Sequence, residues 1–223
     1  MHTSFLIIPG YGNSGPEHWQ SLWQQQDACF RRVEQRDWWS PQCSEWVATL
    51  ERAVAASGPD TVLVAHSLGC GLVAHWAAQT RQRIRAAMLV APPDPEGPAA
   101  ELNIQGFVPV PDLPLAFPSL VVASSDDPYS SLEHAHAAAT RWGSRWHNLG
   151  PCGHINGDSG LGDWPQGRAL RQARHVLQLT AGEQQVEQQQ RFRYSVHWTA
   201  QHPSPSSTRM IHSWIAQKIQ LQS

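Results

Sequence analysis

One stretch of the sequence constrains the fold more than any other. Residues 61–65 form a short, almost wholly apolar and β-branched run, which is typical of a central strand in a parallel sheet. The run leads through His66 into Ser67, and residues 68–79 then show the hydrophobic spacing of a helix. A buried strand that ends at a serine and continues into a helix predicts a strand–turn–helix unit of an α/β fold.

The same alternation extends along most of the chain. Apolar runs predict further strands at residues 4–8, 30–34, 85–91, 119–124 and 145–149. Helical spacing occurs at residues 16–26, 44–56, 132–142 and 166–179. We expect Pro16 in the first turn of the earliest helix, where proline is favoured. Strands and helices in this order predict an α/β fold, with helices on both faces of a mostly parallel central sheet.

Two segments differ from this pattern. Residues 92–118 form a Pro-rich connection without periodicity, which is too short for a large helical lid, so we expect a minimal lid and an open site. From residue 183 the sequence becomes rich in Gln and Glu, and later in Pro and Ser. Such compositions usually stay solvated. We therefore expect one domain at residues 1–182, followed by a polar, poorly ordered C-terminal extension at residues 183–223.

Composition excludes several classes of partner and location. The formal net charge is −2, and the isoelectric point near 6.6 gives no basic field for nucleic acid or anionic lipid. We expect no signal peptide, and we expect no membrane span because no apolar stretch is long enough. Four cysteines without metal-type spacing predict reduced thiols in a cytoplasmic protein. We expect no metal and no cofactor. Neither the Walker A motif nor the G-x-G-x-x-G motif, which bind phosphate groups, is present.

The serine at the end of the central strand has the surroundings of a nucleophile. Ser67 is flanked at two residues on either side by Ala65 and Gly69, which matches the G-x-S-x-G elbow with alanine in the first glycine position. Small flanking residues are needed because the backbone crowds such a strained turn. The helix that follows places the N–H of Leu68 near a developing oxyanion. The alternative is a serine that only caps the helix and takes part in no reaction.

A serine nucleophile needs a base, and the base needs a group that fixes its tautomer. In this type of fold the order is serine, acid, histidine, each after a strand. Asp126 and Asp127 follow the strand at 119–124, and His154 follows the last strand. The pattern does not separate the two aspartates, because one could cap the following helix while the other orients the histidine. Asp127 is slightly favoured as the residue that orients the histidine, because the ring of Pro128 restricts the backbone of the residue before it to extended conformations.

His154 is selected from twelve histidines by its small-residue loop, which begins with Gly153. His66 is the main rival, but a residue adjacent to the nucleophile on a sharp turn normally points elsewhere. We therefore interpret His66 as support for the loop. We expect His134 and His136 to be surface or packing residues.

The loop after the first strand should supply a second oxyanion donor. Glycines in residues 9–13 allow close approach of the backbone, and the N–H of Tyr11 is our choice. The alternative is that Gly10 and Gly12 only form a tight turn. The residues that we expect to line the substrate pocket are His18, Trp19, Asn156 and Trp164.

With these residues, the chain resembles the retinoblastoma-binding-protein-9-like (YdeN-like) family of small serine hydrolases in the α/β-hydrolase superfamily. The resemblance covers roughly residues 3–180 and rests on residues 9–12, Trp19, 66–69, 117–129, 142–144, 153–156 and 159–165. It implies an α/β-hydrolase fold with a minimal lid, and Asp127 as the triad acid. It also implies hydrolysis of small carboxylic esters or amides. Ala65 departs from the usual glycine, and the segment after about residue 183 has no counterpart in the family.

The sequence therefore predicts a serine hydrolase that cleaves small carboxylic esters, or amides, through a Ser67-His154-Asp127 triad and an acyl-enzyme. The alternative from another class is a protein-binding module on the same scaffold, with little or no catalysis. The expected partner is a small-molecule ester or amide, with neither nucleic acid nor membrane. The sequence does not indicate a natural substrate, a protein partner or an oligomeric state.

Overall fold

The structure is a computed structural model that describes residues 3–98 and 102–172. The predicted extension at residues 183–223 and the end of the last predicted helix lie outside the described residues. In the described part, parallel strands form one sheet in the order β2-β1-β3-β4-β5-β6. The strands are β1 (Ser4–Ile8), β2 (Phe30–Arg32), β3 (Thr61–His66), β4 (Ala86–Val90), β5 (Ser119–Ala123) and β6 (Arg145–Asn148).

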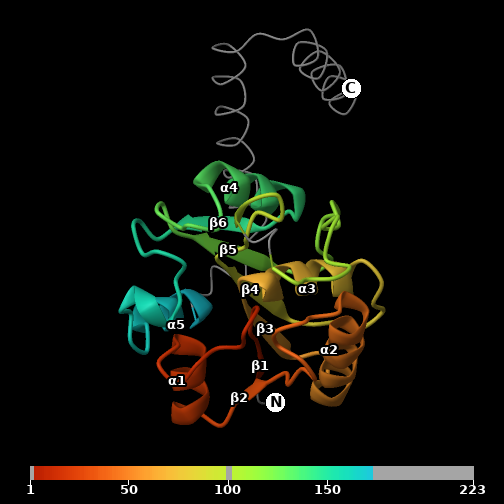
Figure 1. The fold of residues 1–223 in the computed structure, drawn as a ribbon. Coiled ribbons are helices and arrows are strands. Elements are labelled where there is room, and N and C mark those ends of the chain that lie inside the picture. The colour runs from red at the N-terminus through yellow and green to blue at the C-terminus, as the bar shows by residue number, and fades with distance from the viewer. Residues whose placement is uncertain (1–2, 99–101, 173–223) are drawn as a thin grey trace, which may run out of the picture. The chain divides into compact units, whose positions relative to one another are not determined.

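Helices cover both faces of this sheet, as the sequence predicts (Figure 1). They are α1 (Trp19–Gln26), α2 (Cys43–Ser57), α3 (Leu68–Ala77), α4 (Leu132–Arg141) and α5 (Pro165–Gln172). Successive residues of a strand point to opposite faces, so Leu6 and Ile8 join the core under α2, α3 and α4, whereas Ile7 joins the core under α1 and α5. Every residue of β3 is buried, which explains the apolar run at residues 62–65.

The first helix begins later than the sequence predicts. The expected start placed Pro16 in its first turn, but α1 starts at Trp19. His18 is its N-cap, and the ring Nδ1 accepts a hydrogen bond from the N–H of Gln20 at 3.1 Å. The ring nitrogen takes the place of the side-chain oxygen that usually caps a helix.

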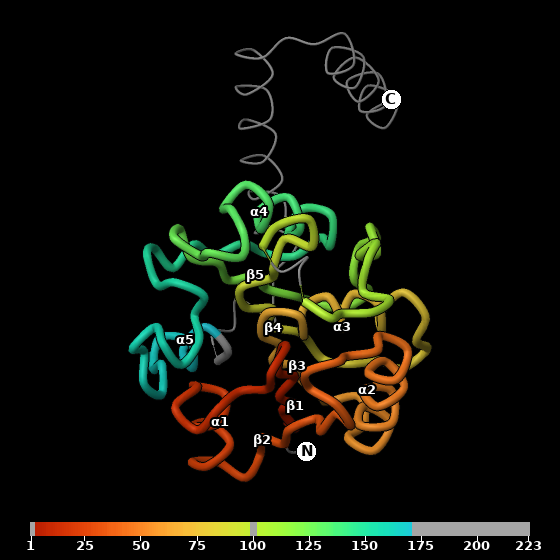
Figure 2. The backbone as a smooth tube through the Cα atoms, viewed as in Figure 1, coloured from red at the N-terminus to blue at the C-terminus, as the bar shows by residue number. Residues whose placement is uncertain are grey.

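The connection between β4 and β5 contains no helical lid in its described residues, which agrees with the expected minimal lid. It can be followed in Figure 2 as the yellow-green tube between these two strands. No helix in the described part of the chain is long and apolar enough to cross a membrane.

The turn between β3 and α3 has a strained backbone. Ser67 has φ 54° and ψ −126°, outside the regions that ordinary residues prefer. Gly69 lies directly against the end of β1: a Cβ there would stand 2.5 Å from the carbonyl oxygen of Ile8 and 2.9 Å from that of Pro9. Both obstacles are backbone atoms, so the turn is compatible only with glycine at this position.

We expect Gly69→Ala to lower the free energy of unfolding by about 3 kcal/mol, because overpacking against fixed backbone forces the strand and helix apart. Gly71→Ala is the matched control within the same helix. Its new Cβ would be 4.0 Å from the Phe107 ring, an ordinary contact, and replacing a helical glycine with alanine stabilises by about 0.5–1 kcal/mol. Urea unfolding of both variants measures this. Equal stabilities would contradict the proposed crowding at Gly69.

Candidate active site

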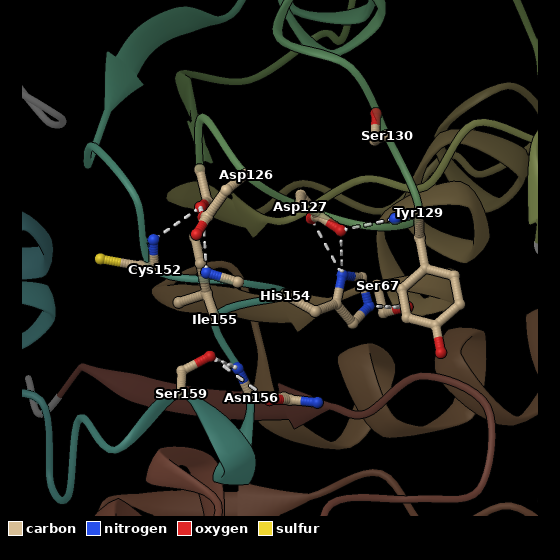
Figure 3. Close-up of polar contacts among 12 residues, drawn as sticks. Ser67, Asp126, Asp127, Tyr129, Ser130, Cys152, His154, Ile155, Asn156 and Ser159 are labelled. Carbon is tan, nitrogen blue, oxygen red and sulfur yellow. Dashed lines mark hydrogen bonds and ion pairs between the residues drawn. The ribbon is translucent and has the colours of Figure 1, made fainter.

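Three side chains from separate loops meet at the carboxyl edge of the sheet (Figure 3). Ser67 follows β3, Asp127 follows β5 and His154 follows β6. The Nε2 atom of His154 lies 2.9 Å from the Oγ of Ser67, and its Nδ1 lies 2.9 Å from both carboxylate oxygens of Asp127. A hydroxyl, an imidazole and a carboxylate therefore form one continuous hydrogen-bonded chain.

The surroundings of this chain restrict the orientation of each group. The side chain of Asp127 is 2% exposed and that of His154 is 9% exposed. Asp127 Oδ1 also accepts a hydrogen bond from the N–H of Tyr129 at 2.9 Å. The Tyr129 ring packs at 63° to the imidazole, with 4.6 Å between the centroids. The carboxylate is thus fixed from its own loop, and the imidazole is held between the carboxylate, the serine and an aromatic ring.

Asp126, which the sequence pattern could not separate from Asp127, has a different role in the structure. Its Oδ1 accepts hydrogen bonds from the Ser124 hydroxyl and from the N–H of Gly153, each at 2.7 Å. The Ser124 bond, followed by the Gly153 bond, lowers the pKa of Asp126. Neither aspartate caps the next helix, because Ser131 does so. Asp126 therefore ties the loop after β5 to the loop that carries His154.

The structure also decides how the Ser67 hydroxyl is used. Ser67 occupies the N-cap position of α3, but its side chain makes no capping hydrogen bond. The hydroxyl is paired with His154 instead. The alternative in which this serine only caps a helix does not describe the observed contact.

The two predicted oxyanion donors both border the serine. Leu68 is the first residue of α3, so its N–H has no acceptor within the helix. Gly10 packs against the elbow, and a Cβ there would stand 2.8 Å from the Cβ of Ser67. This close approach brings the loop of Tyr11 beside the nucleophile, and Tyr11 and Leu68 line the same cavity as Ser67. The loop also makes a tight turn, with the N–H of Asn13 bonded to the carbonyl of Gly10.

His66 supports the loop, as the sequence analysis predicts. Its Nε2 lies 2.9 Å from the backbone carbonyl oxygen of His154. A carbonyl oxygen only accepts, so Nε2 carries the proton and donates it. Complete burial, aided by the neighbouring imidazoles, lowers the pKa of His66 well below its ordinary value. His66 is therefore a neutral residue that holds the backbone of the His154 loop.

His18 is a second buried, neutral histidine beside this site. Burial, followed by the charge of Arg32, lowers the pKa of His18 to about 3. Its Nδ1 accepts from the N–H of Gln20, so the proton is on Nε2. The rings of His18 and His66 are in edge contact, with centroids 4.7 Å apart.

These two histidines predict how stability depends on pH. Their folded-state pKa values lie below the unfolded value near 6.5, so below that pH the unfolded chain binds protons that the folded chain does not. Above about pH 7 these two histidines therefore do not lower the free energy of unfolding. Below that pH the free energy of unfolding falls by about 1.4 kcal/mol per pH unit for each histidine. For His18 this loss continues down to its folded pKa of about 3.

Urea unfolding at about pH 7.5 and about pH 5 tests this, with a loss of about 2 kcal/mol expected per histidine. His18→Asn keeps a capping group and removes one titration, so its loss should be smaller than that of the wild type by this amount. The exposed His136 on α4 provides the control His136→Asn, which should keep the wild-type loss. Equal losses in all three proteins would contradict the assignment.

Two of the expected pocket residues do not face a cavity. Trp19 and Trp164 are each 1% exposed, and their rings pack together with 5.0 Å between the centroids. The Nε1 of Trp19 donates to the carbonyl of Ile155 at 2.8 Å. Their assignment to the substrate pocket is therefore wrong: they belong to the core under α1 and α5, where they support the loop after His154. His18 and Asn156 do line a cleft at the site.

Two hollows meet at Ser67. One is an apolar cavity of about 310 Å³, walled by residues such as Leu68, Leu102, Ile104, Phe107, Val110 and Trp142. The other is a more polar cleft of about 560 Å³, whose walls include Asn13, Glu17, His18, Asn156 and Asp158. The residues of the 92–118 connection that wall the apolar cavity were not predicted from the sequence. The apolar residues of this connection have no regular period. Their number, in a connection without a helix, is nevertheless a signal in the sequence that could have indicated a cavity wall.

The described residues contain no group of three or more His, Cys, Asp or Glu side chains that could hold a metal ion.

His134, predicted as a surface or packing residue, lines the apolar cavity, and its ring lies 3.4 Å from a carboxylate oxygen of Asp94.

Comparison with known proteins agrees with this geometry. The sequence profile of the family described as "Serine hydrolase" matches residues 5–173. The chain belongs to the serine hydrolase family. A search of curated proteins found no match.

One solved structure supports the same family, and two more distant ones share the fold. A YdeN-like hydrolase from Pectobacterium atrosepticum is 31% identical, with a TM-score of 0.69 over 78% of this chain and 91% of that one. The ydeN gene product of Bacillus subtilis is 19% identical, with a TM-score of 0.63 over 77% of this chain and 98% of that one. A thermophilic esterase from Thermogutta terrifontis is 19% identical, with a TM-score of 0.56 over 80% and 92%. This serine hydrolase is therefore a YdeN-like protein with the α/β-hydrolase fold.

Proposed function

We propose that this serine hydrolase cleaves small carboxylic esters through an acyl-enzyme on Ser67. The observation that carries the proposal is the unbroken chain from Ser67 Oγ through both ring nitrogens of His154 to Asp127, with every link at 2.9 Å. These are the distances at which a base can accept the proton of a nucleophile. Asp127 contributes by holding the imidazole and stabilising its charged form.

The reaction follows from these contacts. Ser67 Oγ attacks the ester carbonyl carbon while His154 Nε2 accepts the hydroxyl proton. The N–H groups of Leu68 and Tyr11 stabilise the negative charge on the carbonyl oxygen. His154 then donates its proton to the departing alkoxide, which leaves as an alcohol. Water, activated by the same imidazole, releases the acid and restores the serine.

Esters are favoured over amides because an alkoxide is a better leaving group than an amide anion, so ester cleavage depends less on proton transfer from His154. The solved esterase from Thermogutta terrifontis is a structural relative with that activity in its name. Both considerations support ester hydrolysis as the primary activity.

The test uses the purified full chain with p-nitrophenyl acetate and p-nitrophenyl butyrate, and with the corresponding p-nitroanilides. We expect turnover of the esters, slower turnover of the anilides, and loss of activity after one equivalent of a fluorophosphonate has reacted. Folded protein that neither hydrolyses the esters nor reacts with the fluorophosphonate would overturn the proposal. That outcome would favour a protein-binding role for the same scaffold.

A further inference from the structure

The two hollows beside Ser67 are different in chemistry, and Ser67 lies on the boundary between them. Ser67 and Tyr11 line both. Leu68, whose N–H is a proposed oxyanion donor, lines the apolar cavity and not the polar cleft. His154 lines the polar cleft and not the apolar cavity.

The position of His154 decides which part of an ester enters which hollow. In the proposed reaction His154 must protonate the leaving alkoxide, so the alcohol part has to stand within hydrogen-bonding reach of Nε2. That position is on the side of the polar cleft. The acyl part of the ester then extends from the carbonyl carbon in the other direction, into the apolar cavity.

The walls of the apolar cavity suit a hydrocarbon chain. Ile104, Phe107 and Val110 come from the connection between β4 and β5, and they face Trp142 at the end of α4. The polar side chains of His134 and Arg141, which line this cavity, have partners within the protein. His134 pairs with Asp94 at 3.4 Å and Arg141 pairs with Asp112 at 3.7 Å.

The polar cleft offers donors and negative charge. The Oδ1 of Asn156 accepts from the N–H of Asp158 and from the hydroxyl of Ser159, so its NH₂ group is left as a donor. Figure 3 shows this amide nitrogen pointing away from Ser159. Glu17 and Asp158 add two exposed carboxylates, and no Lys or Arg is among the described residues that line the cleft. An anionic leaving group would meet these carboxylates directly, whereas Arg32, the cation whose charge acts on His18, is bonded to Asn13 and Ser14 and does not line the cleft.

We propose that the substrates are esters of an apolar acid of medium chain length with a polar alcohol that is neutral or positively charged. The apolar cavity takes the acyl chain, and the cleft bordered by Glu17, Asn156 and Asp158 takes the alcohol. This assignment rests on the proposed function, because it uses His154 as the acid that protonates the leaving group.

The acyl side is tested with p-nitrophenyl esters of increasing acyl length. Each buried methylene should raise kcat/KM about three- to fourfold until the cavity is full, after which the gain stops. Gly71 lines this cavity, 4.0 Å from the Phe107 ring once a Cβ is added, so Gly71→Leu fills the space. We expect the octanoate-to-acetate ratio of kcat/KM to fall at least about tenfold. Ala138 on α4 lines the same cavity, so Ala138→Leu is a second variant with the same expected direction if Gly71→Leu does not fold.

The alcohol side is tested at constant acyl length with octanoylcholine, monooctanoylglycerol and octanoylglycolate, which are cationic, neutral and anionic. We expect the anionic ester to have the lowest kcat/KM, by about fivefold or more at low salt, because two carboxylates face it. The double variant Glu17→Gln, Asp158→Asn should remove this difference and keep the octanoate-to-acetate ratio, since it alters only the cleft.

The outcomes separate the two proposals. Absence of ester turnover and of fluorophosphonate labelling would overturn the proposed function itself. An active, labelled enzyme that shows no gain with acyl length, or whose octanoate-to-acetate ratio is unchanged in both cavity-filling variants, would overturn the assignment of the acyl cavity alone. An active enzyme that prefers the anionic ester would overturn the assignment of the alcohol cleft.

Discussion

Replacing Ser67 with alanine is expected to lower kcat for p-nitrophenyl butyrate by about 10⁶-fold, to the level left by substrate binding and oxyanion stabilisation. The reason is that the attacking oxygen is lost while the rest of the site stays in place. Alanine keeps the Cβ, which packs against Gly10, so the close approach of the two loops is preserved. Steady-state kinetics of the wild type and of Ser67→Ala measures the effect. The background rate is taken from a mock purification of cells that express neither protein.

Stability provides the control for this variant. Ser67 makes no capping hydrogen bond to α3, so its removal should leave the urea midpoint close to that of the wild type. A loss of activity that is accompanied by a large loss of stability would indicate misfolding. Retention of more than about one hundredth of the wild-type kcat by a folded Ser67→Ala protein would exclude Ser67 as the nucleophile.

The second large effect is expected from Asp127→Asn, which should lower kcat by about 10⁴-fold at neutral pH. The amide keeps the shape of the carboxylate and can still accept from the N–H of Tyr129. It no longer provides a negative charge for the imidazolium, and its NH₂ group favours the tautomer of His154 in which Nε2 carries the proton. That tautomer cannot accept the proton of Ser67.

The adjacent Asp126 provides a matched control. In Asp126→Asn the side-chain amide oxygen can still accept from Ser124 and from the N–H of Gly153, so the loop should stay in place. We expect kcat to fall by less than about tenfold, since the hydrogen bonds that are weakened do not reach His154 directly. Equal losses in the two variants would contradict the distinct roles that the contacts assign to the two aspartates.

The order of strands and helices could be predicted from the sequence because each element has a periodic signal of its own. The run at residues 61–65 is apolar at every position after Thr61, and all of β3 is indeed buried. The meeting of Ser67, an aspartate and His154 could be predicted because their order matches the usual order of this fold and parallel strands present their carboxyl ends at one edge. The choice between Asp126 and Asp127 was only slightly favoured by the residues themselves, because it depends on which carboxylate meets an imidazole from another loop.

The pocket was the least predictable part of the site. Trp19 and Trp164 lie far apart in the sequence and no periodic signal connects them, so the packing of their rings against each other inside the core could not be predicted. The apolar cavity is walled by residues 102–110 of the connection, where proline interrupts any period that could report an orientation. Residues on irregular backbone are placed by packing against distant elements, and one sequence does not contain that information in a readable form.

The most direct test of the account is the location of the covalent adduct formed by a fluorophosphonate. The full chain is allowed to react, digested and examined by peptide mass spectrometry. A single adduct on Ser67 is the result expected, because its hydroxyl is bonded to an imidazole that is itself bonded to a carboxylate. A stoichiometric adduct on any other residue, with Ser67 unmodified in the inactivated protein, would contradict the central claim.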